Sequence, residues 1–139
     1  MIIFSMGHSN RSFEEFLKIL KNYNIKNLID VRRFPSSRKF PHFNKNYIEE
    51  KMKENGINYV WLGEFLGGKI GSYIEHMKRG EFKEGIKKIE EICKNGNTLF
   101  FCAEKFYWKC HRKFISRELI KRGYKIIDII EDGKEIRIK

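Results

Sequence analysis

Short apolar runs alternate along the chain with longer segments in which apolar residues recur every three or four positions. An apolar run bounded by turn residues is typical of a buried strand. Spacing of three or four is typical of an amphipathic helix. The apolar runs predict strands at residues 2–6, 27–31, 57–62, 98–102, 124–130 and 135–138.

Helical spacing fills most of the gaps between these strands. Ser12 and Glu15 form a capping box at the start of the first helix. Asn44 or Asn46 can cap the second helix, which Gly56 ends. Further helices are expected at residues 73–77, 82–92 and 110–122, after a glycine-rich turn over residues 63–71.

Strands that alternate with helices imply right-handed crossovers and a mainly parallel sheet covered on both faces. The pair Asp132-Gly133 favours a hairpin turn between the last two strands. We therefore predict the α/β class, as a single three-layer domain over residues 1–139. Its sheet is mainly parallel, with helices on both faces and one antiparallel strand from the C-terminal hairpin.

The charge balance of the chain indicates what kind of partner the protein binds. Lysine and arginine outnumber aspartate and glutamate by 29 to 18, for a net charge of +11. Such an excess attracts polyanions, and nucleic acid is the commonest candidate. A Lys-, Glu- and Ile-rich composition is also typical of heat-adapted proteins, which is the alternative explanation. We expect nucleic acid or a nucleotide as the partner; the sequence specifies neither a cofactor nor an oligomeric state.

The apolar runs also bear on location. None approaches the ~20 residues that span a membrane, and the opening segment does not resemble a signal peptide. Three cysteines form no even disulfide framework of the kind found in secreted domains. We therefore expect a cytoplasmic protein that binds no membrane.

The predicted strands end in polar or reactive residues. In open α/β sheets, ligands bind in the crevice outside the carboxyl ends of the strands. Asp30 and Arg32, two positions apart, share a face there, either as a catalytic carboxylate with its arginine or as a structural ion pair. Glu104 shares the direction of the Cys102 side chain if the strand continues. The candidates for chemistry at these ends are His8, Asp30, Cys102, Glu104, Cys110 and His111.

Cys110 stands near the start of a predicted helix, where free N–H groups and the helix dipole favour an anion and lower the pKa of the thiol. Two chemistries are open. In one, Cys110 is a thiolate nucleophile with His8 or His111 as the base. In the other, Cys102 and Cys110 form a redox pair across the loop. In the alternative explanation, neither cysteine has a chemical role and both are small residues that only contribute to packing. Seven residues separate them, which matches no usual zinc spacing, so we predict no metal site.

Residues 32–45 interleave three phenylalanines with five basic residues. Bases stack on aromatic rings and phosphates pair with arginine and lysine, so this composition suits unpaired nucleic acid or a nucleotide. The alternative is a solvated basic loop that its phenylalanines anchor to the core. The candidate phosphate ligands are Ser9, Arg11, Arg32, Arg33, Arg38, Lys39, Lys105 and Arg112, and the candidate base-stacking residues are Phe34, Phe40 and Trp108.

Taken together and in order, these segments resemble the domain of unknown function 488 family. The resemblance implies a small α/β domain in which the segments around His8, Arg32, Cys102 and Cys110 gather in one site. It supplies no reaction. The matching pieces are Gly7-His8-Ser9-Asn10-Arg11, Asp30-Val31-Arg32, Phe34-Pro35-Ser36-Ser37-Arg38, Phe43-Asn44, Tyr59, Leu66-Gly67-Gly68, Cys102-Ala103-Glu104-Lys105 and Cys110-His111-Arg112.

Three functions remain open at this point. We expect an enzyme or enzyme-like domain that acts on nucleic acid or a nucleotide. The first alternative is a non-catalytic nucleic-acid-binding module that uses the same basic surface. The second is a thiol-dependent enzyme that acts on a small anionic metabolite.

Overall fold

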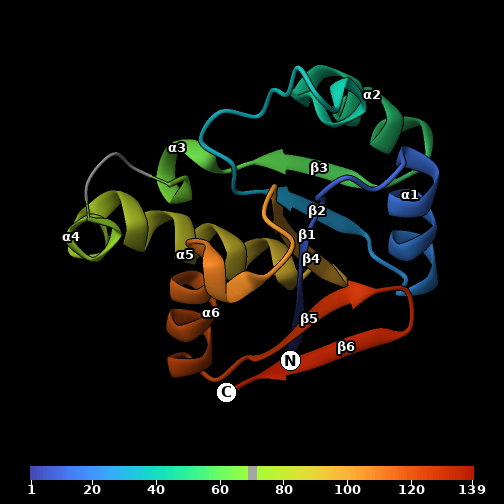
Figure 1. The fold of residues 1–139 in the computed structure, drawn as a ribbon. Coiled ribbons are helices and arrows are strands. Elements are labelled where there is room, and N and C mark those ends of the chain that lie inside the picture. The colour runs from blue at the N-terminus through green and yellow to red at the C-terminus, as the bar shows by residue number, and fades with distance from the viewer. Residues whose placement is uncertain (69–71) are drawn as a thin grey trace.

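Strands and helices alternate along the chain in the computed structural model, which describes residues 1–68 and 72–139 (Figure 1). Its elements are β1 (Ile2–Gly7), α1 (Phe13–Asn22), β2 (Asn27–Asp30), the 3-10 turn η1 (Pro41–Phe43), α2 (Lys45–Glu54), β3 (Asn58–Trp61), α3 (Gly63–Leu66), α4 (Tyr73–Met77), α5 (Gly80–Cys93), β4 (Thr98–Cys102), the 3-10 turn η2 (Tyr107–Lys109), α6 (Arg112–Lys121), β5 (Lys125–Glu131) and β6 (Lys134–Ile138).

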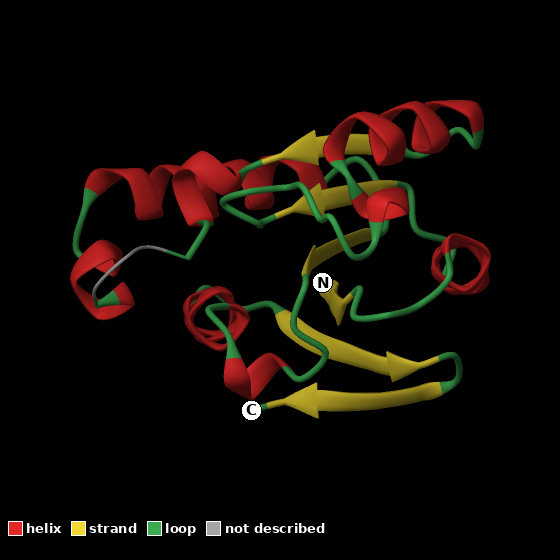
Figure 2. Cartoon of the chain, turned by 45° about the horizontal axis from the view of Figure 1, so that its top comes forward, coloured by secondary structure: helices red, strands yellow, loops and turns green. Residues whose placement is uncertain are grey.

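Within the described residues, one six-stranded sheet has the order β3-β2-β4-β1-β5-β6. The pairs among β1 to β5 are parallel, and β6 pairs antiparallel with β5. Figure 2 shows the β5–β6 hairpin at one edge of the sheet. The predicted α/β class, mainly parallel sheet and antiparallel last strand are confirmed. The order also places β4 between β1 and β2, so the ends of these three strands are neighbours.

Helices cover both faces of the sheet. On one face α1 and α2 pack on the sheet, and on the other face α3, α5 and α6 do so. The neighbours Phe100 and Phe101 of β4 point to opposite faces, as strand geometry requires, and each joins a different core. In residues 1–68 and 72–139, no helix is long and apolar enough to cross a membrane.

Local details differ from the sequence expectations in three places. Asn44 precedes α2, but its side chain does not cap the helix; it accepts a hydrogen bond from the N–H of Ser37. The strand β2 ends at Asp30, because its carboxylate binds the N–H of Arg32 and the chain turns there. The predicted glycine-rich turn begins with the helical turn α3, and residues 69–71 of that turn lie outside the described residues.

Gly7 lies where the end of β1 passes against the loop that follows β4. A Cβ atom on this residue would lie 1.9 Å from the carbonyl oxygen of Glu104, which is backbone and cannot rotate away. We expect Gly7→Ala to lower the free energy of unfolding by about 1–3 kcal/mol, the usual cost of overpacking. Urea denaturation measures it. Gly80→Ala is the control, because its Cβ would meet nothing within 4 Å, and an equal loss in both variants would contradict the prediction.

Candidate functional site

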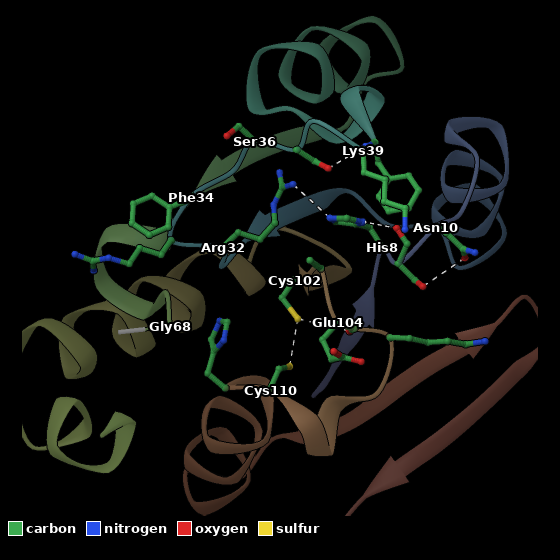
Figure 3. Close-up of a pocket in the computed structure, with 17 residues that line it drawn as sticks. His8, Asn10, Arg32, Phe34, Ser36, Lys39, Gly68, Cys102, Glu104 and Cys110 are labelled. Carbon is green, nitrogen blue, oxygen red and sulfur yellow. Dashed lines mark hydrogen bonds between the residues drawn. The ribbon is translucent and has the colours of Figure 1, made fainter. Parts of the chain in front are cut away.

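A pocket of about 790 Å³ opens at the carboxyl ends of β1, β2 and β4 (Figure 3). It lies where ligands bind in open α/β sheets. Twelve of the residues predicted from the sequence line it: His8, Ser9, Arg32, Arg33, Phe34, Lys39, Phe40, Cys102, Glu104, Lys105, Cys110 and His111. The other lining residues are not among the predicted site residues, and these are Asn10, Ser36, Ser37, Gly68 and Ala103.

The sheet register explains why these segments meet. Gly7 pairs with Cys102, and Asp30 pairs with Phe101, so the three strands end at the same level. The N–H of His8 then donates to the carbonyl of Cys102 over 2.8 Å, which continues the ladder past the strand end. The register therefore delivers the imidazole of His8 and the sulfur of Cys102 to one crevice.

The two cysteines of the site are in contact. Cys102 ends β4 and Cys110 follows η2, and their sulfur atoms lie 3.2 Å apart with both thiols free (Figure 3). Only 3% of Cys102 is exposed, whereas Cys110 is half-buried. Cys110 is therefore the sulfur that a molecule in the pocket meets first.

Arg112 supports this sulfur pair from inside the protein. Its Nε–H donates to Cys102 Sγ over 3.1 Å, and one Nη1 donates to both Ser5 Oγ (2.7 Å) and Asp128 Oδ1 (2.6 Å). Its Nη2 donates to two backbone carbonyls of the loop after β4. The side chain is fully buried. Arg112 therefore binds the sulfur of Cys102, and it lies outside the lining where the sequence analysis expected a phosphate ligand.

This arrangement separates the two thiol pKa values. The hydrogen bond from the Cys102 thiol, together with the charge and the backbone N–H of Arg112, lowers the pKa of Cys110 to about 6 against the opposing effect of burial. The same hydrogen bond and deep burial raise the pKa of Cys102. At pH 7 the pair is a Cys110 thiolate beside a Cys102 thiol. Cys110 lies near the start of α6, as predicted, although the helix begins at Arg112, two residues later than expected, with His111 at its N-cap.

Two neutral histidines flank the sulfur pair. His8 Nδ1–H donates to the carbonyl of Ser9 over 2.8 Å, and His111 Nε2–H donates to a backbone carbonyl just after β2 over 3.0 Å. Burial lowers the pKa of each imidazole to about 4. At pH 7 each therefore keeps one unprotonated nitrogen, Nε2 of His8 and Nδ1 of His111, that can accept a proton.

Asp30 and Arg32 form a buried ion pair at the end of β2. Both oxygens of the carboxylate accept from the guanidinium, over 2.8 and 2.7 Å, and Tyr59 OH donates to one of them over 2.5 Å. Asp30 is fully buried and lies outside the pocket lining, so its carboxylate positions Arg32. The remaining nitrogen, Arg32 Nη1, lies 3.5 Å from His8 Nε2 at the pocket wall (Figure 3).

The rim of the pocket is cationic and aromatic. Arg33 lies over the ring of Phe34, at 5.6 Å from the guanidinium carbon, and Lys39 Nζ lies 5.5 Å from the centre of the Phe40 ring. Phe34 is 75% exposed, which is unusual for a side chain that only anchors a loop. Glu104 is exposed at the mouth. β4 ends at Cys102, as predicted, so the condition under which Glu104 would share the direction of the Cys102 side chain is not met.

Besides Asp30 and Arg112, three further predicted residues lie outside this lining as the structure describes it. The guanidinium of Arg11 donates to the carbonyls of Gly7 and Ile130, so it stabilises the fold beside the site. Arg38 is exposed beyond the rim. Trp108 is 45% exposed and stacks on Phe106, with the ring centres 4.8 Å apart.

A model of the family described as "Domain of unknown function DUF488" matches residues 12–119 of the chain. The chain belongs to this family. No curated protein and no solved structure matches the chain significantly. The DUF488 match contains both cysteines, Arg112 and the basic loop, which confirms the resemblance seen in the sequence.

Asp128, which holds Arg112 in this DUF488 domain, is not among the residues predicted from the sequence. A signal was present, because Asp128 stands two positions from Ile126 and two from Ile130 in a predicted strand. It therefore shares a face with apolar residues, and a carboxylate on such a face needs a buried partner. Arg112 gives the matching signal, because it lies three residues before the buried Ile115 on α6.

Proposed function

We propose that this DUF488 domain is an enzyme that uses the Cys110 thiolate on a nucleotide or an unpaired nucleic-acid segment. One observation carries the proposal: the sulfur of Cys110 lines the same pocket as Arg32 and the cationic, aromatic rim. Arginine and lysine bind phosphate, and exposed rings stack on bases. The thiolate is the nucleophilic form of cysteine.

The contacts support a division of roles. Asp30 holds Arg32 so that Nη1 stays available for a phosphate oxygen at the pocket wall. The unprotonated nitrogens of His8 and His111 are the proton acceptors at pH 7, and that of His8 also contacts Arg32 Nη1. Arg112 stays charged and stabilises negative charge on the sulfur pair.

The volume of the pocket and the residues of its rim indicate which class of substrate fits. A volume of about 790 Å³ is typical of pockets for small molecules. It accepts a nucleotide or the end of a strand, and a duplex would first have to release a base. The exposed ring of Phe34 favours a substrate with a base over a small anionic metabolite without one.

The reactivity of Cys110 tests the catalytic half of the proposal. We expect alkylation by iodoacetamide, followed by mass spectrometry, to rise as pH passes about 6 and to level off by about pH 8, because the thiolate is the reacting form. The reactivity of an ordinary thiol, with a pKa of about 8.5, would still be rising at pH 8. Cys93→Ala is the control, because Cys93 is buried in the core away from the pocket lining. A profile of ordinary thiol type would contradict the proposal.

Protection by ligand tests the shared pocket. Saturating mononucleotide or short single-stranded oligonucleotide should slow the alkylation of Cys110, and added salt should remove the protection as phosphate contacts weaken. Oligonucleotide that binds while Cys110 alkylation stays unchanged would favour the binding-module alternative. No binding and no protection at low salt would exclude nucleic acid and nucleotides as substrates.

A further inference from the structure

We propose that Cys110 and Cys102 are the attacking and resolving thiols of a thiol–disulfide exchange activity toward small anionic disulfides. The products are a Cys102–Cys110 disulfide and two small thiols. This activity needs no nucleotide, so it goes beyond the proposed function and is tested separately from it.

The distance between the sulfurs carries the inference. They lie 3.2 Å apart, and a disulfide bond is about 2.05 Å long, so an approach of about 1 Å closes it. Cys102 is fixed in the centre of the sheet at the end of β4. Cys110 lies between η2 and α6, outside both elements, in an extended backbone conformation. The movement therefore falls on Cys110 and leaves the sheet in place.

The unequal burial of the sulfurs assigns their order. Cys110 is half-buried and lines the pocket, so a disulfide that enters from solvent reaches it first. Cys102 is only 3% exposed, and its sulfur is held between Cys110 and the guanidinium of Arg112. Cys102 can therefore attack only a bond that already includes Cys110 Sγ. This division between an accessible and a buried thiol is what an attacking and a resolving cysteine require.

The rim sets the substrate class as an anionic disulfide. Arg33, Lys39 and Lys105 line the mouth of the pocket, where Glu104 is the single carboxylate among the lining residues that the structure describes. Carboxylate groups on a small disulfide, such as those of glutathione disulfide, would pair with these cations.

The exchange balances in two steps. The Cys110 thiolate attacks one sulfur of the disulfide R–S–S–R, forms a mixed disulfide with it and releases R–S⁻. The departing thiolate takes the proton of the Cys102 thiol through solvent. The Cys102 thiolate then attacks Cys110 Sγ, forms the internal disulfide and releases the second R–S⁻. The protein loses two electrons and one proton, and the small disulfide gains them as one thiol and one thiolate.

Mass spectrometry of the intact protein tests this order directly. All proteins carry Cys93→Ala, so that the two site cysteines are the remaining thiols, and each is incubated with glutathione disulfide and then quenched with acid. The protein with both cysteines should lose two hydrogens and keep no adduct. Cys102→Ser should accumulate one glutathione adduct, because nothing resolves it. Cys110→Ser should gain at least tenfold less adduct, because Cys102 is buried. Dithiothreitol should restore all free thiols.

Two results would overturn the inference. One is a stable glutathione adduct on the protein that keeps both cysteines, which would show that Cys102 does not resolve. The other is equal adduct formation in the two single variants, which would show no order between the sulfurs. A failure here leaves the oligonucleotide protection experiment unaffected, because that experiment uses the fully reduced protein. Loss of protection with normal exchange would contradict the proposed function alone.

Discussion

Replacing Arg112 with methionine is expected to lower the free energy of unfolding by about 3–5 kcal/mol, because it breaks a buried ion pair and leaves a carboxylate without its partner. The same change should slow the alkylation of Cys110 at pH 7 by about tenfold, because the charge that favours the thiolate is lost. Urea denaturation measures the first effect, and the pH profile of alkylation measures the second.

The contacts of Arg112 explain why both effects are large. Its side chain is fully buried, and its Nη1 lies 2.6 Å from Asp128 Oδ1. The other oxygen, Asp128 Oδ2, has no hydrogen-bond partner among the described residues. Burial already raises the pKa of this carboxyl, and the guanidinium is the main group that opposes the shift. Without Arg112, the carboxyl must take up a proton or remain charged in the core.

A second substitution separates the structural effect from the chemical one. Asp128→Asn removes the buried charge, so the double variant Arg112→Met, Asp128→Asn should be more stable than Arg112→Met alone. It should not recover the fast alkylation of Cys110, because asparagine supplies no positive charge to the sulfurs. Recovery of both properties would show that Arg112 acts only through stability. Wild-type alkylation in Arg112→Met would show that the guanidinium does not stabilise the thiolate.

The fold and the position of the candidate site can be predicted from local patterns in the sequence. Apolar runs separated by amphipathic segments predict a parallel sheet, and the polar residues after 7, 30 and 102 mark its binding edge. The spacing of Asp30 and Arg32 predicts either a catalytic carboxylate with its arginine or a structural ion pair, and the structure shows the ion pair, with Arg32 in the pocket lining and Asp30 behind it. The prediction of the sheet succeeds because hydrophobic patterning and side-chain alternation are local rules that tertiary packing rarely changes.

Other parts of the site depend on loop paths that no local rule determines. Whether Cys102 and Cys110 meet depends on the course of the residues between them, and there only the short η2 turn is regular. The direction of Arg112 is misjudged for a different reason. A charged residue at the first turn of a helix normally faces solvent, and here a buried carboxylate in the next strand, 16 residues further along the chain, reverses that preference.

The site contains the same arrangement twice, a buried carboxylate that holds an arginine side chain. Asp128 holds Arg112, which contacts the sulfur pair, and Asp30 holds Arg32, which faces the pocket. In each case the carboxylate is fully buried and the arginine reaches the reactive region. Fixing an arginine before a ligand arrives reduces the ordering cost of binding. Disruption of the two pairs should therefore have different effects. Loss of the Asp128 contacts should affect the reactivity of the Cys110 thiolate, and loss of Asp30 should affect the binding of an anion.

Asp30→Asn is expected to lower the free energy of unfolding by about 3–5 kcal/mol, because Arg32 is 6% exposed and would remain charged without its partner. It should also weaken the binding of a labelled single-stranded oligonucleotide by about tenfold, since asparagine has one acceptor oxygen in place of two and the guanidinium would lose the bidentate charged pairing that orients it. Fluorescence anisotropy at fixed salt measures the binding, at a temperature where urea denaturation shows the variant folded.

The direction of the change in binding decides what Asp30 does. Removing a negative charge makes the protein more basic, and that effect alone would strengthen the binding of a polyanion. Weaker binding by Asp30→Asn would therefore show that the orientation of Arg32 outweighs the gain in net charge. The control Glu14→Gln makes the same change of charge on the exposed face of α1, and it should leave binding equal or slightly tighter. If both variants bind more tightly, net charge governs the interaction, and the proposed contact between Arg32 and phosphate is wrong.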